Sequence, residues 1–120
     1  MRPGPILAAL ILSSLSPLGA HAFSASHDGR WQVELETTVG ACAKSGVAVL
    51  TVKGGQLAAI DASGVSPWGY IDDSNTFVGH FNAGSKMLRA NGDVKGNSAS
   101  GPWSSQTDYC GGRWTAHKIN

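Results

Sequence analysis

The chain has 120 residues, of which nine are Lys or Arg and eight are Asp or Glu, so its formal net charge at pH 7 is +1. This balance, without a basic stripe or an acidic tail, argues against a nucleic acid or an anionic membrane surface as the partner. The chain contains 16 glycines and no helical runs of Leu, Glu and Lys. The composition therefore favours short strands joined by turns.

The first 22 residues have the pattern of a secretory signal peptide. Arg2 precedes an apolar run at residues 6–12, and residues 20–22 supply the small-x-small motif that signal peptidase accepts. A membrane anchor is the alternative, but the apolar run is shorter than the ~20 residues that span a bilayer, and serines and a proline interrupt its continuation. We therefore predict cleavage after Ala22, export, and a single β domain at residues 23–120.

The exported part contains eight predicted strands. In the first, at residues 31–37, apolar and polar residues alternate, so Trp31, Val33 and Leu35 share one face of a half-buried strand. The Gly-Gly pair at residues 54–55 indicates a hairpin between the second and third strands. The remaining strands are predicted at residues 47–53, 56–61, 68–72, 76–82, 87–95, 99–104 and 113–119.

Three positions inside these strands have a specific structural meaning. Asn91-Gly92 could form a type I′ turn, but a turn would leave two very short pieces, so we predict one longer strand. Gly79 lies between two phenylalanines at period two, which suggests a bend or a close strand crossing. Pro102 implies an edge or a bulged position for the seventh strand.

Eight short strands with tight turns predict an all-β, up-and-down antiparallel meander that closes, or nearly closes, into a small barrel. The tripeptide Gly-Arg-Trp occurs at residues 29–31 and again at residues 112–114, where it opens the first and last strands. This repeat suits two strands that meet and pair.

The two cysteines lie where such a closure would bring them together. Cys42 follows the first strand and Cys110 precedes the last, so both fall at one end if those strands are antiparallel neighbours. An even count in a small exported domain favours a disulfide, and the bond would close a loop of about 70 residues, stabilising the fold by roughly 4 kcal/mol. A metal-binding pair and a catalytic thiol are alternatives, but the CxxC spacing that would support them is missing.

Two resemblances extend this interpretation. Gly29-x-Trp31, with a basic residue on the last strand, resembles the pattern of calycin-type barrels, which include lipocalins and avidins. The resemblance implies that Trp31 plugs one end of the barrel and that Arg113 packs across it through a cation–π contact. Trp114, beside Arg113, is expected to be a core or barrel-end residue as well.

A second set of motifs is similar to an uncharacterised family of small exported bacterial proteins. The motifs are Asp28-Gly29-Arg30-Trp31, Gly40-Ala41-Cys42, Gly92 with Gly96-Asn97, Ser100-Gly101-Pro102-Trp103 and Cys110-Gly111-Gly112-Arg113-Trp114-Thr115-Ala116. This resemblance implies the bacterial periplasm or the medium as the location, and it implies pairing of the two cysteines. It implies no activity.

No metal site or cofactor is predicted. His27, His80 and His117 have neither HxxxH spacing nor a neighbouring cysteine, so a zinc site is not indicated. Cleavage after Ser24 instead of Ala22 would place His27 third from a free amino terminus, where it could help to bind copper(II) or nickel(II). Residues 72–75 carry oxygen ligands for calcium but lack the alternating acids and the glycine of a dedicated loop, so a solvated turn is preferred.

No catalytic residue is predicted either. The G-x-S-x-G elbow of hydrolases is missing. Glu34 and Glu36 share a strand face, which could suit glycoside hydrolysis, but they are better explained as the wet side of the first strand. We therefore expect the protein not to be an enzyme.

The remaining candidates for function are aromatic. Trp68 and Trp103 lie beside turns, and if exposed they would suit sugar or peptide binding together with Tyr70, although burial of both tryptophans is the preferred interpretation. We predict a monomeric, non-catalytic binding module for a small apolar or sugar-like ligand in the barrel mouth. The alternative is a protein-interaction role, such as a protease inhibitor or an envelope assembly factor.

Overall fold

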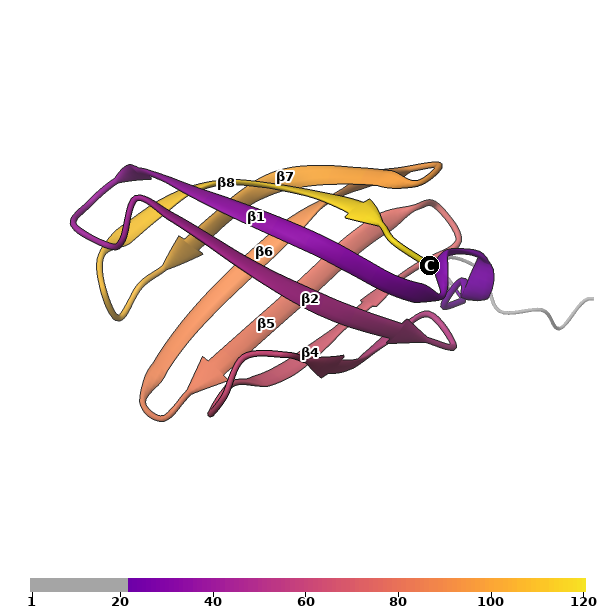
Figure 1. The fold of residues 1–120 in the computed structure, drawn as a ribbon, viewed down its shortest axis with the longest axis horizontal. Helices are drawn as coiled ribbons and strands as arrows, with labels where there is room; N and C mark the ends of the chain where they lie inside the picture. Colours follow the sequence, from indigo (N-terminus) through magenta and orange to yellow (C-terminus); the bar gives the residue numbers. More distant parts are fainter. Residues whose placement is uncertain (1–21) are drawn as a thin grey trace, which may run out of the picture.

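The protein is a closed barrel of eight antiparallel strands in a computed structural model that describes residues 22–120 (Figure 1). Each strand pairs with the next along the chain, and β8 returns to pair with β1. The predicted meander, its closure and its eight strands are confirmed. The strands are β1 (Gly29–Val39), β2 (Ser45–Lys53), β3 (Gln56–Ile60), β4 (Ser66–Ile71), β5 (Thr76–Ala83), β6 (Lys86–Lys95), β7 (Ser98–Ser105) and β8 (Cys110–Lys118). The predicted signal peptide lies outside the described residues, except for its last residue.

The first and last strands form the closing seam of the barrel. They pair antiparallel from Trp31, opposite Lys118, to Val39, opposite Gly111. Cys42 and Cys110 form a disulfide at one end of this seam, with their Cα atoms 6.0 Å apart. The expected bond is confirmed, and it links the loop after β1 to the start of β8.

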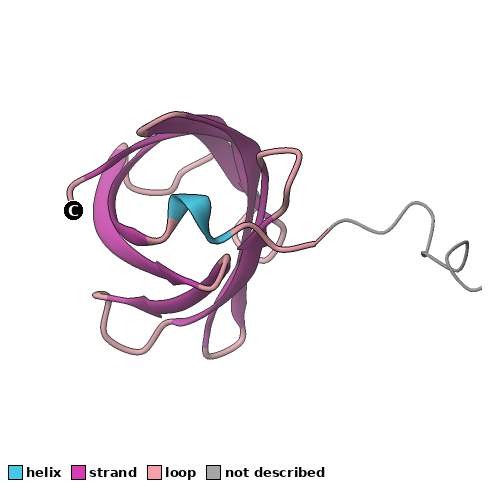
Figure 2. Ribbon diagram, turned by 90° about the vertical axis from the view of Figure 1, so that its right-hand side faces the viewer, coloured by secondary structure: helices cyan, strands magenta, loops and turns pink. Residues whose placement is uncertain are grey.

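The amino-terminal segment covers the opposite end of the barrel, which we call the closed end. Figure 2 shows its short 3-10 helix η3 (Ala25–His27) lying across the centre of the ring of strands. Two sets of hydrogen bonds hold the segment there. The Asp28 carboxylate accepts from the amides of Gly54 and Gly55 at 2.7 and 2.9 Å, and the Ser24 amide donates to the Ile71 carbonyl at 2.8 Å.

The sixth strand runs unbroken through Asn91-Gly92, which confirms the longer strand. Its ladder with β7 lacks the pairs that would involve Gly101 and Pro102. An edge or a bulge is expected at Pro102, and the structure shows an interruption of the β6–β7 pairing there, within a closed barrel. The indole N–H of Trp114 donates there to the carbonyls of Asn91 and Pro102 at 3.0 and 3.2 Å, so a side chain supplies the missing donor.

Gly79 makes room for the two aromatic residues on either side of it. A Cβ atom at Gly79 would lie 2.6 Å from the Phe77 ring and 3.2 Å from the Phe81 ring. Both rings face the barrel interior, and because Gly79 has no side chain, it leaves room for them on the inner face of β5, which lies between β4 and β6.

Candidate functional site: an apolar cavity open at one end

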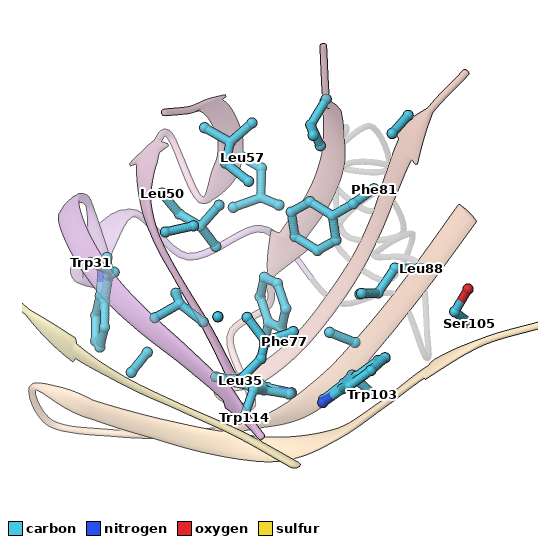
Figure 3. Close-up of a pocket in the computed structure, with 18 of the residues that line it drawn as sticks. Trp31, Leu35, Leu50, Leu57, Phe77, Phe81, Leu88, Trp103, Ser105 and Trp114 are labelled. Carbon is cyan, nitrogen blue, oxygen red and sulfur yellow. The ribbon is translucent and has the colours of Figure 1, made fainter. Parts of the chain in front are cut away.

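The barrel encloses a cavity of about 410 Å³, which is the size range of small-molecule sites (Figure 3). All eight strands contribute to its wall, and nearly all of the side chains that face it are apolar. The larger ones are Trp31, Leu35, Leu50, Leu57, Phe77, Phe81, Leu88, Trp103 and Trp114. Phe77 packs edge-on against Trp114, with 5.4 Å between ring centroids, at the middle of the barrel.

Small residues account for the hollow interior. The period of two points every second residue inward, and several of these inward positions hold glycine or alanine instead of a large side chain. Those that line the cavity are Gly46, Ala48, Ala90, Ala99 and Ala116. A ring of large aliphatic residues at the same positions would fill the barrel.

Trp31 seals the cavity at the closed end. Its side chain is buried, and its indole N–H donates to the His27 carbonyl at 2.9 Å, so the ring is fixed beneath η3. Trp31 therefore lies at one end of the barrel, which is where a plug would have to lie.

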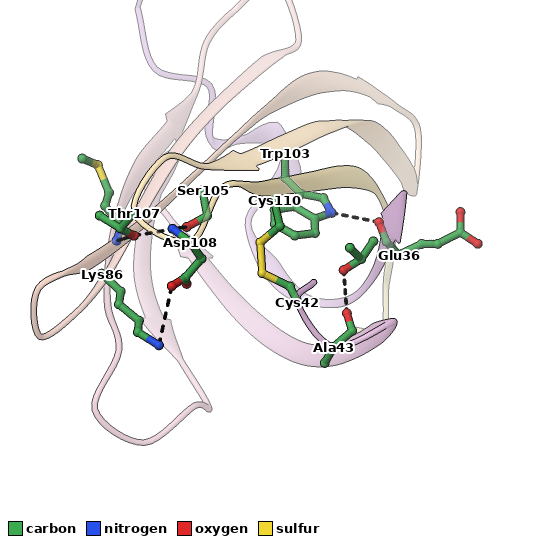
Figure 4. The surroundings of a disulfide bond; sticks show 11 residues. Glu36, Cys42, Ala43, Lys86, Trp103, Ser105, Thr107, Asp108 and Cys110 are labelled. Atoms are coloured by element: carbon green, nitrogen blue, oxygen red, sulfur yellow. Dashed lines mark hydrogen bonds and ion pairs between the residues drawn. A yellow bond between two sulfur atoms is a disulfide. The ribbon is translucent and has the colours of Figure 1, made fainter. Parts of the chain in front are cut away.

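The opposite end, which we call the mouth, carries the polar groups of the cavity wall. Lys86 Nζ and Asp108 Oδ1 lie 3.7 Å apart and both residues line the cavity (Figure 4). Ser105, beside them, is buried, and its hydroxyl accepts from the Asp108 amide at 3.3 Å. On the other side of the mouth, the Thr37 hydroxyl donates to the Ala43 carbonyl at 2.5 Å.

The disulfide also belongs to the mouth. Cys42 lines the cavity, and Cys110 is buried beside Trp103 (Figure 4). The bond therefore holds one side of the cavity rim to the end of the closing seam.

The three candidate ligand-binding residues do not form one site. Trp103 lines the cavity, is 6% exposed and donates its indole N–H to the Glu36 carbonyl at 3.1 Å. Trp68 and Tyr70 lie on the outer face of β4, because Gly69 and Ile71 between and beside them point inward. Trp68 is 54% exposed. Burial, the preferred interpretation for both tryptophans, is right for Trp103 and wrong for Trp68.

The expected packing of Arg113 across Trp31 is wrong. Arg113 is exposed and lies opposite Glu36, whereas the β8 residue opposite Trp31 is Lys118. Five residues of strand separate the two positions, which is about 17 Å. The basic residue of the Gly-Arg-Trp repeat thus faces solvent, and Trp114 beside it faces inward.

The candidate metal ligands have other partners. His27 Nε2 lies 2.9 Å from the Asn75 side-chain oxygen at the closed end. The Asp72 carboxylate accepts from the amides of Ser74 and Thr76 at 2.9 and 3.0 Å, which is the geometry of a side-chain-stabilised turn. Within residues 22–120, no cluster of three or more His, Cys, Asp or Glu side chains could hold a metal ion.

The part of the chain that the structure describes contains no helix that is both long and apolar enough to cross a membrane. No protein-family model matches the chain, and no curated protein is significantly similar to it. Of the properties that the two resemblances imply, the structure shows the fold, which is a closed eight-stranded antiparallel barrel with one disulfide.

Proposed function

We propose that this protein is an exported, monomeric and non-catalytic module that binds a small apolar ligand inside the barrel. The observation that carries the proposal is the cavity of about 410 Å³, whose wall is almost entirely apolar and which Trp31 and η3 close at one end. An apolar ligand would gain free energy by leaving water for this wall. Export is supported by the leader pattern of residues 1–22.

The mouth supports a more specific ligand class. Lys86, Asp108 and Ser105 are polar residues in contact with one another on the cavity wall, and they lie at the end that opens to solvent. A ligand with an apolar body and one polar end would place the body beside Trp114 and Phe77. Its polar end would remain among these groups, where hydrogen-bond partners and water are both within reach.

A pair of alanine substitutions tests the cavity directly. Ala48 lies on β2 and lines the cavity, so Ala48→Phe would place a ring in the space that a ligand needs. Ala59 lies on β3 and is exposed, so Ala59→Phe adds the same ring outside the barrel and serves as the matched control. The readout is the fluorescence of 1-aminoanthracene, a neutral apolar fluorophore, titrated against the purified protein.

We expect the wild type and Ala59→Phe to bind the fluorophore with equal affinity and Ala48→Phe to bind it at least tenfold more weakly. Both variants should keep the far-UV circular dichroism of the wild type. Equal binding by Ala48→Phe and the wild type, or no binding by the wild type, would refute an internal ligand site.

A protein-interaction role is the second candidate, and Tyr109 is the observation that favours it. Tyr109 is 86% exposed, and its backbone has a φ of 54°, in the left-handed region that non-glycine residues seldom adopt. The neighbouring disulfide at Cys110 holds this loop in place, and Val39, 65% exposed, lies in the same shallow depression. Projecting and rigid aromatic residues are typical anchors of protein interfaces.

This second role predicts that Tyr109→Ala abolishes capture of an envelope protein or inhibition of a protease without changing fluorophore binding. Tyr109→Phe is the control, because it keeps the ring and removes the hydroxyl. If both variants behave as the wild type does in capture and inhibition assays, the exposed tyrosine is no anchor.

A further inference from the structure

Trp68 differs from the other three tryptophans of the barrel. Trp31, Trp103 and Trp114 are each at least 94% buried, and each donates its indole N–H to a backbone carbonyl. Trp68 is 54% exposed, and within residues 22–120 its indole N–H has no acceptor. The three buried tryptophans have evident structural roles, whereas more than half of the Trp68 side chain is exposed and its indole N–H makes no hydrogen bond within residues 22–120.

Trp68 is the most exposed member of a row of four rings on the outside of the barrel, which we call the outer aromatic row. Phe23 stacks on Tyr70 at 5.0 Å between centroids, Tyr70 meets Trp68 edge-on at 5.8 Å, and Trp68 lies 5.0 Å from the ring of His80. Contact with its neighbours fixes each ring. The row therefore presents a preformed apolar surface on the wall of the barrel, separate from the cavity and from the mouth.

A positive charge lies beside this row. Arg89 on β6 is opposite His80 on β5, and both point outward because their neighbours Leu88 and Phe81 face the cavity. Arg89 is exposed and forms no ion pair within residues 22–120. Strands β4 and β6 are about 10 Å apart, since neighbouring strands lie about 4.8 Å apart, so the arginine side chain can reach a molecule that rests on Trp68.

The chemistry of this surface is selective. The exposed indole offers a flat apolar face and a free N–H donor, and the guanidinium offers several donors and a charge without a partner. Its natural complement has an apolar face of ring C–H groups, hydroxyls that accept hydrogen bonds, and a carboxylate. A pyranose ring of a uronic acid has all three.

We propose that the outer aromatic row and Arg89 bind an acidic oligosaccharide. One pyranose ring stacks on Trp68, a ring hydroxyl accepts from the indole N–H, and the carboxylate of a neighbouring sugar pairs with the guanidinium of Arg89. The site is independent of the internal cavity, so either can fail without the other.

The test compares two tetrasaccharides that differ only at C6. One is β-1,4-linked tetraglucose and the other is the tetraglucuronate with the same linkage. The readout is the indole N–H signal of Trp68 in ¹H–¹⁵N spectra of the purified protein, assigned from its loss in Trp68→Phe. Dissociation constants for the variants that lack this signal come from calorimetry.

We expect both sugars to shift the Trp68 signal and leave the three buried indoles in place, with the tetraglucuronate binding at least fivefold more tightly. Trp68→Ala should weaken both sugars at least tenfold, and Trp68→Phe less than threefold because a ring remains. Arg89→Gln should remove the preference for the acidic sugar and leave the neutral one within twofold of the wild type. Ala48→Phe, which alters the cavity, should change neither affinity.

Several results would overturn the proposal. These are an unchanged Trp68 signal at 10 mM of either sugar, equal affinities for the two sugars in the wild type, and an unaltered preference in Arg89→Gln. Tetraglutamate binding as tightly as tetraglucuronate would also overturn it, because the surface would then recognise charge and not a sugar.

Discussion

Removal of the disulfide should cost this barrel a large part of its stability. Cys42 and Cys110 are 68 positions apart, and a bond that closes a loop of this length stabilises a fold by about 4 kcal/mol through the entropy of the unfolded chain. A domain of this size is stable by roughly 5–15 kcal/mol in total. The double variant Cys42→Ala/Cys110→Ala should therefore remain folded, because the β1–β8 ladder persists, with a free energy of unfolding lower by about 3–4 kcal/mol.

Urea unfolding followed by tryptophan fluorescence measures this difference. Alanine is preferred to serine because Cys110 is buried and a hydroxyl there would need a partner. Reduction of the wild type should give the same loss, and the reductant should leave the double variant unchanged. A loss below about 1 kcal/mol in the double variant would contradict the expected dependence on loop length, because the unfolded chain would then gain little conformational entropy when the bond is removed.

Three further predictions concern the closed barrel and the proposed signal peptide. Trp114→Phe should lower the free energy of unfolding by about 1–3 kcal/mol, because the carbonyls of Asn91 and Pro102 lose their indole donor. Trp68→Phe at the exposed site should change it by less than about 0.5 kcal/mol in the same urea titration. Asp28→Ala should cost about 1–2 kcal/mol in thermal unfolding, since the carboxylate ties the amino-terminal segment to the β2–β3 turn, and Asp93→Ala on an exposed strand position should cost little. Cleavage of the proposed signal peptide should give an intact mass that corresponds to a chain that begins at Phe23. A start two residues later would contradict this and create the amino terminus that a copper site needs.

The strands are predictable because the period of two is strong and the turns are marked by glycine, asparagine and serine. The start of the last strand has the largest error of the predicted starts. The pattern predicts a beginning at residue 113, but β8 begins at Cys110 and includes two glycines. Glycine weakens a strand prediction, yet a Cβ at Gly112 would meet the backbone of Glu36 and Thr37, so the close pairing of β1 with β8 depends on its absence.

The candidate ligand residues cannot be placed from the pattern alone. A period of two shows that Trp68 and Tyr70 share a face, but it does not show which face points inward. The usual rule that the larger apolar residues point inward fails on β4, because a Cβ at Gly69 would lie 2.9 Å from the Gly79 backbone and 3.0 Å from the Leu57 side chain. Because the neighbouring strands approach so closely, only glycine fits at this inward position, and the two aromatic residues occupy the outward positions.

The predicted position of Arg113 is wrong for a related reason. The repeated Gly-Arg-Trp motif correctly indicates that β1 and β8 pair, but it carries no information on register. In antiparallel strands, equal motifs at the two starts lie at opposite ends of the pair, so Arg113 is near the mouth and Trp31 is at the closed end. The paired motifs therefore indicate the topology of the barrel and not the contacts between its side chains.

The cavity is reflected in the residue types at the inward positions of the strands, which the overall composition does not reveal. Once the inward face of each strand is known, alanine or glycine is found at positions where a filled barrel would need leucine or phenylalanine, among them Ala48, Ala90, Ala99 and Ala116. A void the size of a leucine side chain truncated to alanine costs about 2–5 kcal/mol, and substitutions that fill voids are among the commonest ways to stabilise a protein. Small residues repeated around one apolar interior are therefore better explained by a requirement for space than by a requirement for stability, and this favours a bound ligand over a purely structural barrel.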